Sequence, residues 1–418
     1  MVTVIGGVVK DYEWGIIDGL APWCGGATGR PQAELWFGAH PSGPSPVLSA
    51  EDAALPHSAD SVRCDANGVA SRSPAVMHAA SLLDAGGVPL LVKLLAAAQP
   101  LSVQVHPRAK LADDWWEAQQ APGAEQILAD ANEKTELLVA LSEFEAFVGW
   151  RPLAEAISIL SGIPGARDAV RLLTLGDRPS AIRSLLALDD RTESVSLLPL
   201  AAKAAGLAPA DCAAFEMVVR VYPGDRGALL TALLAHVSLS PGSAVFVPAG
   251  VPHSYIHGLG LEVMTTSDNV LRLGLTPKPI FVSEALDALD DTAVPQVIHV
   301  EIGEAIRPVG APFEVRLVGA RSAGNDADAQ RSTDEGSTIG QSRGPRSSDS
   351  RDSAATGHLP TGRFRLCLAI EGSATVTTDD GTVSLGQGTA AVLVAAEPTA
   401  TVSTTGLVAL VLDRGASL

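Results

Sequence analysis

Cysteine is scarce in this chain, and the cysteines present do not pair in sequence. The 418 residues include four, at Cys24, Cys64, Cys212 and Cys367, and no two of them form a CxxC motif. Neither a thiolate zinc site nor a disulfide framework is therefore indicated. Such a chain suits a reducing compartment, and we expect it in the cytoplasm.

Positive charge and long apolar runs are also in short supply. The chain has 29 Lys and Arg against 47 Asp and Glu, a net charge of −18 at pH 7. Nucleic acids and anionic membranes bind clustered Lys and Arg, so we expect neither as a partner. No apolar stretch reaches the roughly 18 residues of a membrane helix, and the start, Met1–Lys10, lacks the features of a signal peptide. We expect a soluble, unprocessed protein.

What the sequence does contain is short strand-like runs on both sides of a helical stretch. From residue 1 to 150, apolar runs broken by Gly, Pro and Asn predict strands. Between residues 151 and 234, Leu, Ile and Ala recur at helical spacing, with Ala228–His236 as the last predicted helix. Strand character then returns. We therefore expect a discontinuous β domain, 1–150 and 235–297, with a helical insertion, 151–234.

The remainder of the chain, 298–418, is predicted to form a second β domain. From Arg321 to Thr361 the aliphatic content is too low to offset the entropy of ordering, which indicates a disordered linker or long loop. Short apolar runs separated by Gly-rich turns follow it. No histidine follows His358, which falls in the predicted linker. We therefore expect this domain to hold no metal and to have a packing role.

Residues far apart in the sequence have the chemistry of one metal site. Gln104 and His106 are two apart in an alternating apolar run, so a strand would point both to the same face. His253 follows a Pro/Gly turn that joins two predicted strands, and Glu136 lies between these segments. Two imidazoles, a carboxylate and an amide suit a divalent ion such as zinc, with a position left open for water or substrate. That arrangement indicates a catalytic site. A lone histidine such as His253 is more often a core residue, but its combination with Gln104 and His106 favours the metal.

The turn before His253 resembles the second metal motif of the cupin superfamily. Further segments with a distinctive order along the chain are Tyr12–Gly15, Ala33–Pro41, Lys93, Pro100–Pro107, Lys134–Glu136, Pro248–Tyr255 and Ser267–Lys278. Together, and in this order, they resemble the type I mannose-6-phosphate isomerases. The resemblance implies a mainly β fold, a bicupin of two jelly-roll domains plus an all-α domain. It also implies interconversion of mannose 6-phosphate and fructose 6-phosphate, which supplies mannose for GDP-mannose and glycan synthesis or for mannose catabolism.

The resemblance further implies roles for individual residues. One zinc per chain would be held by Gln104, His106, Glu136 and His253. An aldose–ketose exchange moves a proton between C1 and C2 through a cis-enediol, so it needs a base and a group that holds the developing oxyanion. Arg272 suits the enediolate charge, and zinc can polarise the substrate oxygens or order the substrate. The base stays open among Glu262, Lys134 and Asp268. Further candidates to bind the phosphate or steer the sugar are Lys93, Ser102, Lys134, Tyr255 and Lys278, with Trp14 and Glu34 beside them, more as braces of the barrel than as substrate contacts.

One departure from the family's pattern stands out. Members of the family often read His-Lys-Pro-Glu where this chain has Glu133-Lys134-Thr135-Glu136. A role for that histidine in ring opening has no counterpart here, and Glu133 would weaken phosphate binding if it faced the pocket.

Two other functions fit parts of the pattern. A cupin oxygenase would use iron, but its usual ligand set does not require the cations Arg272 and Lys278. A sugar-phosphate sensor would keep the pocket and lack turnover. The intact set of metal ligands, together with Glu262 and Arg272, favours the isomerase. We expect a sugar phosphate as its partner, and a monomer.

Overall fold

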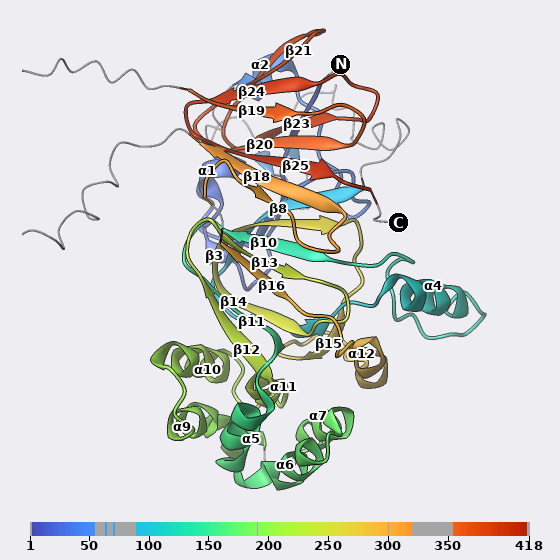
Figure 1. The fold of residues 1–418 in the computed structure, drawn as a ribbon, viewed down its shortest axis with the longest axis vertical. Coiled ribbons are helices and arrows are strands. Elements are labelled where there is room, and N and C mark those ends of the chain that lie inside the picture. Colours follow the sequence, from blue (N-terminus) through green and yellow to red (C-terminus); the bar gives the residue numbers. More distant parts are fainter. Residues whose placement is uncertain are drawn as a thin grey trace, which may run out of the picture.

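The computed structural model describes residues 2–54, 63–64, 70–71, 89–189, 191–299, 301–319 and 354–415. The chain folds mainly into β-sheets, with most of its helices gathered at one end of an elongated molecule (Figure 1). This confirms the predicted mainly β architecture with a run of helices. Within the described ranges, no helix combines the length and the apolar character needed to span a bilayer.

The largest sheet has eleven strands and contains the segments that the sequence singled out. Successive side chains of each strand point to opposite faces of this sheet, so one face can be apolar and the other polar. In β8, Val92 and Leu94 point into a hydrophobic core, whereas Lys93 points to the opposite face. The main path runs β16 (Gln296–His299), β13 (Ser243–Val247), β10 (Glu136–Ala140), β14 (His253–Thr265), β8 (Leu90–Ala97), β5 (Glu34–Phe37) and β2 (Val8–Lys10), and β9 (Val103–Val105), β11 (Phe144–Trp150), β12 (Leu234–Leu239) and β15 (Leu271–Gly274) pair beside it.

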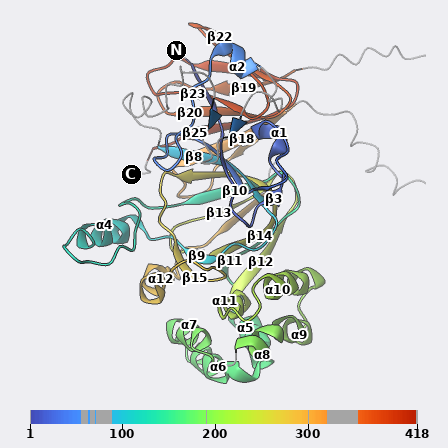
Figure 2. The same ribbon diagram turned by 180° about the vertical axis from the view of Figure 1, so that it is seen from behind.

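Two further sheets form the opposite end of the molecule from most helices (Figure 2). The six-stranded sheet is β1 (Thr3–Gly6), β23 (Thr389–Leu393), β20 (Arg365–Glu371), β25 (Leu407–Asp413), β18 (Phe313–Gly319) and β17 (Ala305–Ile306). The four-stranded sheet is β19 (Ala355–Leu359), β24 (Ala400–Thr404), β21 (Ala374–Thr378) and β22 (Gly381–Leu385). Two small ribbons pair β3 (Ile16–Ile17) with β4 (Pro31–Gln32), and β6 (Arg63–Cys64) with β7 (Ala70–Ser71).

One continuous core joins the large sheet to the six-stranded sheet. It contains Val92 and Phe246 from the former and Phe313 and Leu366 from the latter. The rings of Phe246 and Phe313 meet edge to face, with centroids 6.3 Å apart. The first strand of the chain, β1, pairs with β23 and so lies in the six-stranded sheet, although residues 1–150 were expected to belong together. The chain therefore closes its C-terminal β region with its own beginning.

The helices between residues 153 and 233 pack around a second core of Leu, Ile and Ala side chains. Asp177 accepts a hydrogen bond from the backbone N–H of Ser180 at 3.0 Å and so caps α7. Helix α4 instead projects from the side of the molecule (Figure 1). The helices are α1 (Ala21–Cys24), α2 (Ala50–Ala54), α4 (Ala109–Ala118), α5 (Leu153–Ser161), α6 (Arg167–Thr174), α7 (Arg178–Leu186), α8 (Arg191–Ser196), α9 (Leu198–Ala204), α10 (Pro209–Val221), α11 (Gly227–Leu230) and α12 (Val282–Ala288), with 3₁₀ turns η1 (Pro164–Ala166) and η2 (Thr231–Leu233).

Two expectations about local structure are wrong. The helix predicted over Ala228–His236 ends at residue 233, and His236 lies in β12, opposite Phe147 of β11. Its Nε2 lies 2.6 Å from a carboxylate oxygen of Glu145. Pairing with β11 therefore prevails over the local helical spacing.

The predicted linker is shorter than expected at its C-terminal end. Its last part contains β19, an edge strand paired with β24, and His358 lies in that strand. Only Gly357 and Leu359 of β19 are buried, so its apolar signal in the sequence is weak. Residues 321–353 of the predicted linker lie outside the described residues.

Candidate active site

A cavity of about 790 Å³ lies on the face of the large sheet that carries the polar side chains. Most of the residues that the sequence singled out line it. These are Trp14, Glu34, Lys93, Ser102, Gln104, Lys134, Glu136, Tyr255, Glu262, Asp268, Arg272 and Lys278. The other two, His106 and His253, are fully buried against Glu136. The structure therefore brings the whole predicted set to one place.

Strand register explains why these residues meet. His253 at the start of β14 lies opposite Gln104 of β9, and Gln104 lies opposite Arg272 of β15. On the same sheet, Lys93 of β8 lies directly opposite Glu262 of β14. Residues directly opposite in an antiparallel pair have neighbouring side chains. Segments that are distant in sequence thus form adjoining parts of one cavity wall.

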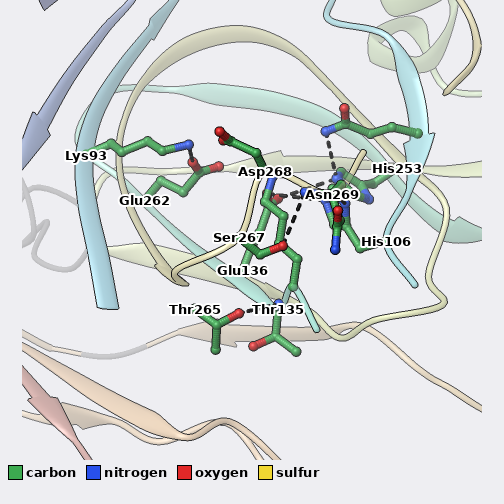
Figure 3. Close-up of polar contacts among 12 residues, drawn as sticks. Lys93, His106, Thr135, Glu136, His253, Glu262, Thr265, Ser267, Asp268 and Asn269 are labelled. Atoms are coloured by element: carbon green, nitrogen blue, oxygen red, sulfur yellow. Dashed lines mark hydrogen bonds and ion pairs between the residues drawn. The ribbon is translucent and has the colours of Figure 1, made fainter. Parts of the chain in front are cut away.

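The two histidines and Glu136 form a compact group that could hold a metal ion. His106 Nε2 lies 3.3 Å from one oxygen of Glu136, and His253 Nε2 lies 3.4 Å from the other. The ligand atoms of the three residues all lie within 4.8 Å of one another. The ring centroids of the two imidazoles lie 4.9 Å apart, and Figure 3 shows both histidines together with Glu136.

Each imidazole presents one ring nitrogen to this group. His106 Nδ1 donates to the carbonyl of Asn269 at 2.7 Å, and His253 Nδ1 donates to the carbonyl of Val251 at 3.1 Å. Each Nε2 is then unprotonated in the neutral ring. Burial, with help from Lys134, lowers the pKa of His106 to about 3, so this ring is neutral at pH 7. Among the described residues, the buried His106 Nε2 has no hydrogen-bond partner, which fits a metal ligand.

Gln104 completes the donor set. Its Nε2 lies 3.1 Å from His253 Nε2, and its Oε1 accepts a hydrogen bond from Ser102 Oγ at 3.2 Å. A half-turn of the amide presents its oxygen to the same place. Tyr255 donates its hydroxyl to Glu136 at 3.1 Å, so it holds the carboxylate in addition to lining the cavity. The residues present therefore fit a divalent ion such as zinc with mixed N/O ligands.

Two lysines in the cavity are paired with carboxylates. Lys134 Nζ lies 2.7 Å from Glu136, and Lys93 Nζ lies 2.8 Å from Glu262 and 4.0 Å from Glu34 (Figure 3 shows the pair Lys93 and Glu262). Burial alone would raise the pKa of Glu136, but Lys134 and His106 outweigh it and hold that pKa well below its usual range. Burial raises the pKa of Glu262, with Lys93 opposing the shift. The two carboxyl groups therefore differ in proton affinity.

Two other cations face the cavity without an acidic partner. Arg272 donates to the carbonyl of Val270 at 3.3 Å, and Lys278 Nζ lies 5.6 Å from the centre of the Tyr12 ring. Within the described residues, neither side chain forms an ion pair. Burial lowers the pKa of both, and the charge of Arg272 lowers that of Lys278 further. An anion that enters the cavity would meet two uncompensated positive charges.

Asp268 lies at the rim rather than deep in the cavity. Its side chain is 40% exposed, its Oδ2 accepts a hydrogen bond from Ser42 at 3.1 Å, and His40 Nε2 lies 3.4 Å away. Burial lowers the pKa of His40, although Asp268 opposes the shift. The three candidates for the base thus differ, because Lys134 is bound to Glu136, Asp268 is half exposed, and Glu262 is buried.

Two residues that the sequence did not assign also shape the site. Tyr12 lines the cavity and stacks on Trp14, with ring centroids 5.7 Å apart. Asn269 is buried, and its side-chain amide forms hydrogen bonds with backbone groups of residues 129, 130 and 132. Its backbone carbonyl accepts a hydrogen bond from His106 Nδ1. Both residues lie within segments that carry the family resemblance. Their place in these segments was the sequence signal that could have identified them as site residues. Their individual roles depend on contacts between distant segments.

Comparison with known proteins shows the family. The family model for the phosphomannose isomerase type I catalytic domain matches residues 4–153. A mannose-6-phosphate isomerase of Salmonella typhimurium is 35% identical over 289 residues, which cover 66% of this chain and 71% of that protein. The human mannose-6-phosphate isomerase is 31% identical over 317 residues, which cover 68% and 72%. The chain belongs to the type I phosphomannose isomerase family.

Solved structures of the family agree with this fold. A mutant of phosphomannose isomerase from Salmonella typhimurium superposes with a TM-score of 0.74 at 25% identity, covering 99% of both chains. A mannose 6-phosphate isomerase bound with zinc and yttrium superposes with a TM-score of 0.71 at 25% identity, again over 99% of both chains. The fold is thus shared along nearly the whole chain.

Glu133, one of the two residues that depart from the family motif, is not among the described residues that line the cavity. The backbone N–H of Ala109 donates to its carboxylate, and Arg108 lies close enough to act on its charge. Ala109 begins α4, and a helix N-terminus favours a carboxylate. Thr265 Oγ1 also donates to the carbonyl of Glu133 at 2.8 Å. Glu133 therefore ties its own segment to the start of α4.

Glu133→Gln is expected to leave the KM for mannose 6-phosphate within about twofold, because its charge faces α4. The free energy of unfolding should stay unchanged or rise slightly, because burial raises the pKa of this carboxyl despite the opposing effects of Ala109 and Arg108. Steady-state kinetics and urea unfolding measure the two effects. Glu125→Gln, at an exposed position, controls for the general change in net charge. A severalfold fall in KM specific to Glu133→Gln would show that this carboxylate opposes the substrate phosphate.

Proposed function

We propose that this chain interconverts mannose 6-phosphate and fructose 6-phosphate as a zinc-dependent isomerase. The observation that carries the proposal is the convergence, in one cavity, of a His/His/Glu group, a buried carboxylate with raised pKa and two unpaired cations. The names of the family members support the substrate, and a solved relative bound with zinc supports the metal. One zinc per chain would match the one such group among the described residues.

Gln104, His106, Glu136 and His253 would hold the metal. When bound there, zinc supplies a Lewis acid that polarises the carbonyl or hydroxyl oxygens of the sugar. The chain's own residues prepare this position in advance. Asn269 and Val251 fix the ring orientations, and Lys134 and Tyr255 fix the carboxylate.

We propose that Glu262 carries the proton between C1 and C2 of the sugar, through a cis-enediol intermediate. A base that must accept a proton and then return it works best when its pKa lies near the operating pH. Burial raises the pKa of Glu262 toward that range, and Lys93 at 2.8 Å keeps the carboxylate in place. Lys134 is less suited because it is bound to Glu136 at 2.7 Å.

Arg272 and Lys278 would supply the positive charge that the reaction needs. The enediolate carries negative charge on oxygen, and a fixed guanidinium stabilises such charge without reorganisation. Arg272 lies one strand from Gln104, so it faces the oxygens of a sugar held at the metal. We assign the phosphate to the outer part of the cavity, where Lys278 lies beside Tyr12.

A coupled assay for fructose 6-phosphate formed from mannose 6-phosphate tests the proposal. We expect activity that disappears on chelation and returns on addition of zinc. A zinc-loaded protein that binds mannose 6-phosphate in calorimetry without turnover would instead show a sugar-phosphate sensor. Return of activity with Fe²⁺ but not with Zn²⁺ would show that zinc is the wrong metal.

We further infer that the two β regions are the cupin domains of a bicupin and that the helices form a separate inserted domain. The extensive likeness to solved relatives supports this division. The residue boundaries, the monomeric state and the cytoplasmic location stay predictions from the sequence.

A further inference from the structure

A single turn of the helical region reaches the two loops that flank the cavity. This turn, residues 222–226, connects α10 to α11, which begins at Gly227. The Tyr222 hydroxyl donates to the carbonyl of Pro100 at 2.9 Å, just before the strand that carries Gln104. Asp225 bonds the backbone at Leu275, just after the strand that carries Arg272. The helical region thus contacts both sides of the candidate active site.

Asp225 uses both of its carboxylate oxygens on backbone groups. Oδ1 accepts from the N–H of Gly227 at 2.8 Å, at the start of α11. Oδ2 accepts from the N–H of Leu275 at 2.9 Å, across to the cavity loop. Hydrogen bonds to an ionised acceptor are stronger than neutral ones. The carboxylate therefore joins the turn to the loop directly.

The loop needs such support because Leu275 has an unusual backbone conformation. Its φ is 57°, in the left-handed region that residues with a side chain rarely adopt. The preceding residue, Gly274, approaches Gly227 so closely that a Cβ on Gly227 would lie 2.4 Å from Gly274 Cα. Leu275 is buried and lines the cavity. A strained residue persists only where its surroundings fix it.

We propose that Asp225 is a positioning residue for the candidate active site. Its carboxylate holds Leu275 in the left-handed conformation and so sets the path of the segment that carries Arg272 on one side and Lys278 on the other. The proposal rests on the proposed function for what this segment binds. The helical region would then affect the reaction indirectly, because Asp225 positions the residues that contact the substrate and does not contact it itself.

The test compares Asp225→Ala and Asp225→Asn with Asp177→Ala in the full chain. Asp177 is a matched control because it also caps a backbone N–H in the helical region, at the start of α7 and away from the cavity. Hydrogen exchange measured by mass spectrometry reports β15 and the loop after it, residues 271–278, and steady-state kinetics report the reaction. Zinc content and thermal midpoint report the rest of the protein.

Asp225→Ala is expected to raise exchange in residues 271–278 and to lower kcat/KM about a hundredfold, because small displacements of catalytic groups have effects of that size. Zinc content should stay at the wild-type level. Asp225→Asn keeps one acceptor oxygen and should show a smaller change of the same kind. Asp177→Ala should change neither quantity by more than about twofold, as expected for a cap on a remote helix.

A rescue separates positioning from general stability. Glycine adopts a left-handed φ without strain, so Asp225→Ala should cost less activity in a Leu275→Gly background than in the wild type. Equal losses in the two backgrounds would overturn the proposal. If Asp225→Ala does not fold, Asp225→Asn takes its place. Unchanged hydrogen exchange in residues 271–278 of Asp225→Asn would also overturn the proposal. If the wild type lacks turnover, a rise in exchange confined to this loop would still support the positioning role while the isomerase function fails.

Discussion

His253→Ala is expected to remove zinc and to lower kcat by at least about a thousandfold, because the lost Lewis acid is worth several kcal/mol. His253 is fully buried, and its Nε2 points at both Glu136 and Gln104. Alanine leaves one imidazole too few for a tight site. Zinc content by mass spectrometry and the coupled assay, run on the same preparation, measure the two losses together.

His257→Ala is the matched control for this loss. His257 lies on the same strand, β14, but its side chain is exposed and it does not line the cavity among the described residues. It should keep zinc and turnover. Full activity of His253→Ala after chelator treatment would contradict the assignment of the metal. A fall in activity with His257→Ala of the same size would point to damage to β14 instead.

Arg272→Ala is expected to keep zinc and to lower kcat about a hundredfold or more, as when a single oxyanion contact is removed. Arg272 lies across from Gln104 and forms no ion pair within the described part of the chain, so its charge is free to meet the enediolate. Arg272→Lys should recover part of the loss, because it restores charge without the planar fork. Single-turnover kinetics separate this effect from substrate binding.

The exposed Arg171 on α6 provides the control for loss of an arginine. Arg171→Ala should leave both kcat and KM unchanged. If Arg272→Ala raises KM and leaves kcat unchanged, the guanidinium binds substrate and transition state equally, and its proposed role is wrong. Loss of zinc from Arg272→Ala would show that the residue supports the metal group instead.

Local periodicity predicted the parts of the site but not their assembly. Alternation along a strand is enough to place Gln104 and His106 on one face. Their approach to His253 depends on the register between β9 and β14, which involves distant segments. The same limit applies to Asn269, whose amide joins residues that are remote in sequence. Family resemblance supplied the order of the segments, and the structure supplies their contacts.

Where the sequence misled, a neighbouring strand or helix decided the outcome. Residues 234–236 continue the helical spacing of apolar side chains, yet they pair with β11 as the start of β12. β19 has few apolar side chains, and it forms a strand because it pairs with β24. The direction of Glu133, which the sequence left open, depends on α4, which begins within reach of its carboxylate. Each case turns on a contact between segments that a local pattern does not contain.

The pairing of β1 with β23 has a consequence for the order of events during synthesis. β1 is made before the other described strands, but its partner β23 is made only after the whole of the large sheet. A nascent chain that ends after β16 holds every residue of the cavity, while the sheet that packs behind it is still missing apart from β1. Until then, within the described residues, β1 can bond only residues 46–48 along one edge, and the edge that pairs with β23 is open to incorrect pairing. We therefore expect the assembly of the six-stranded sheet, rather than that of the metal site, to limit the yield of folded protein.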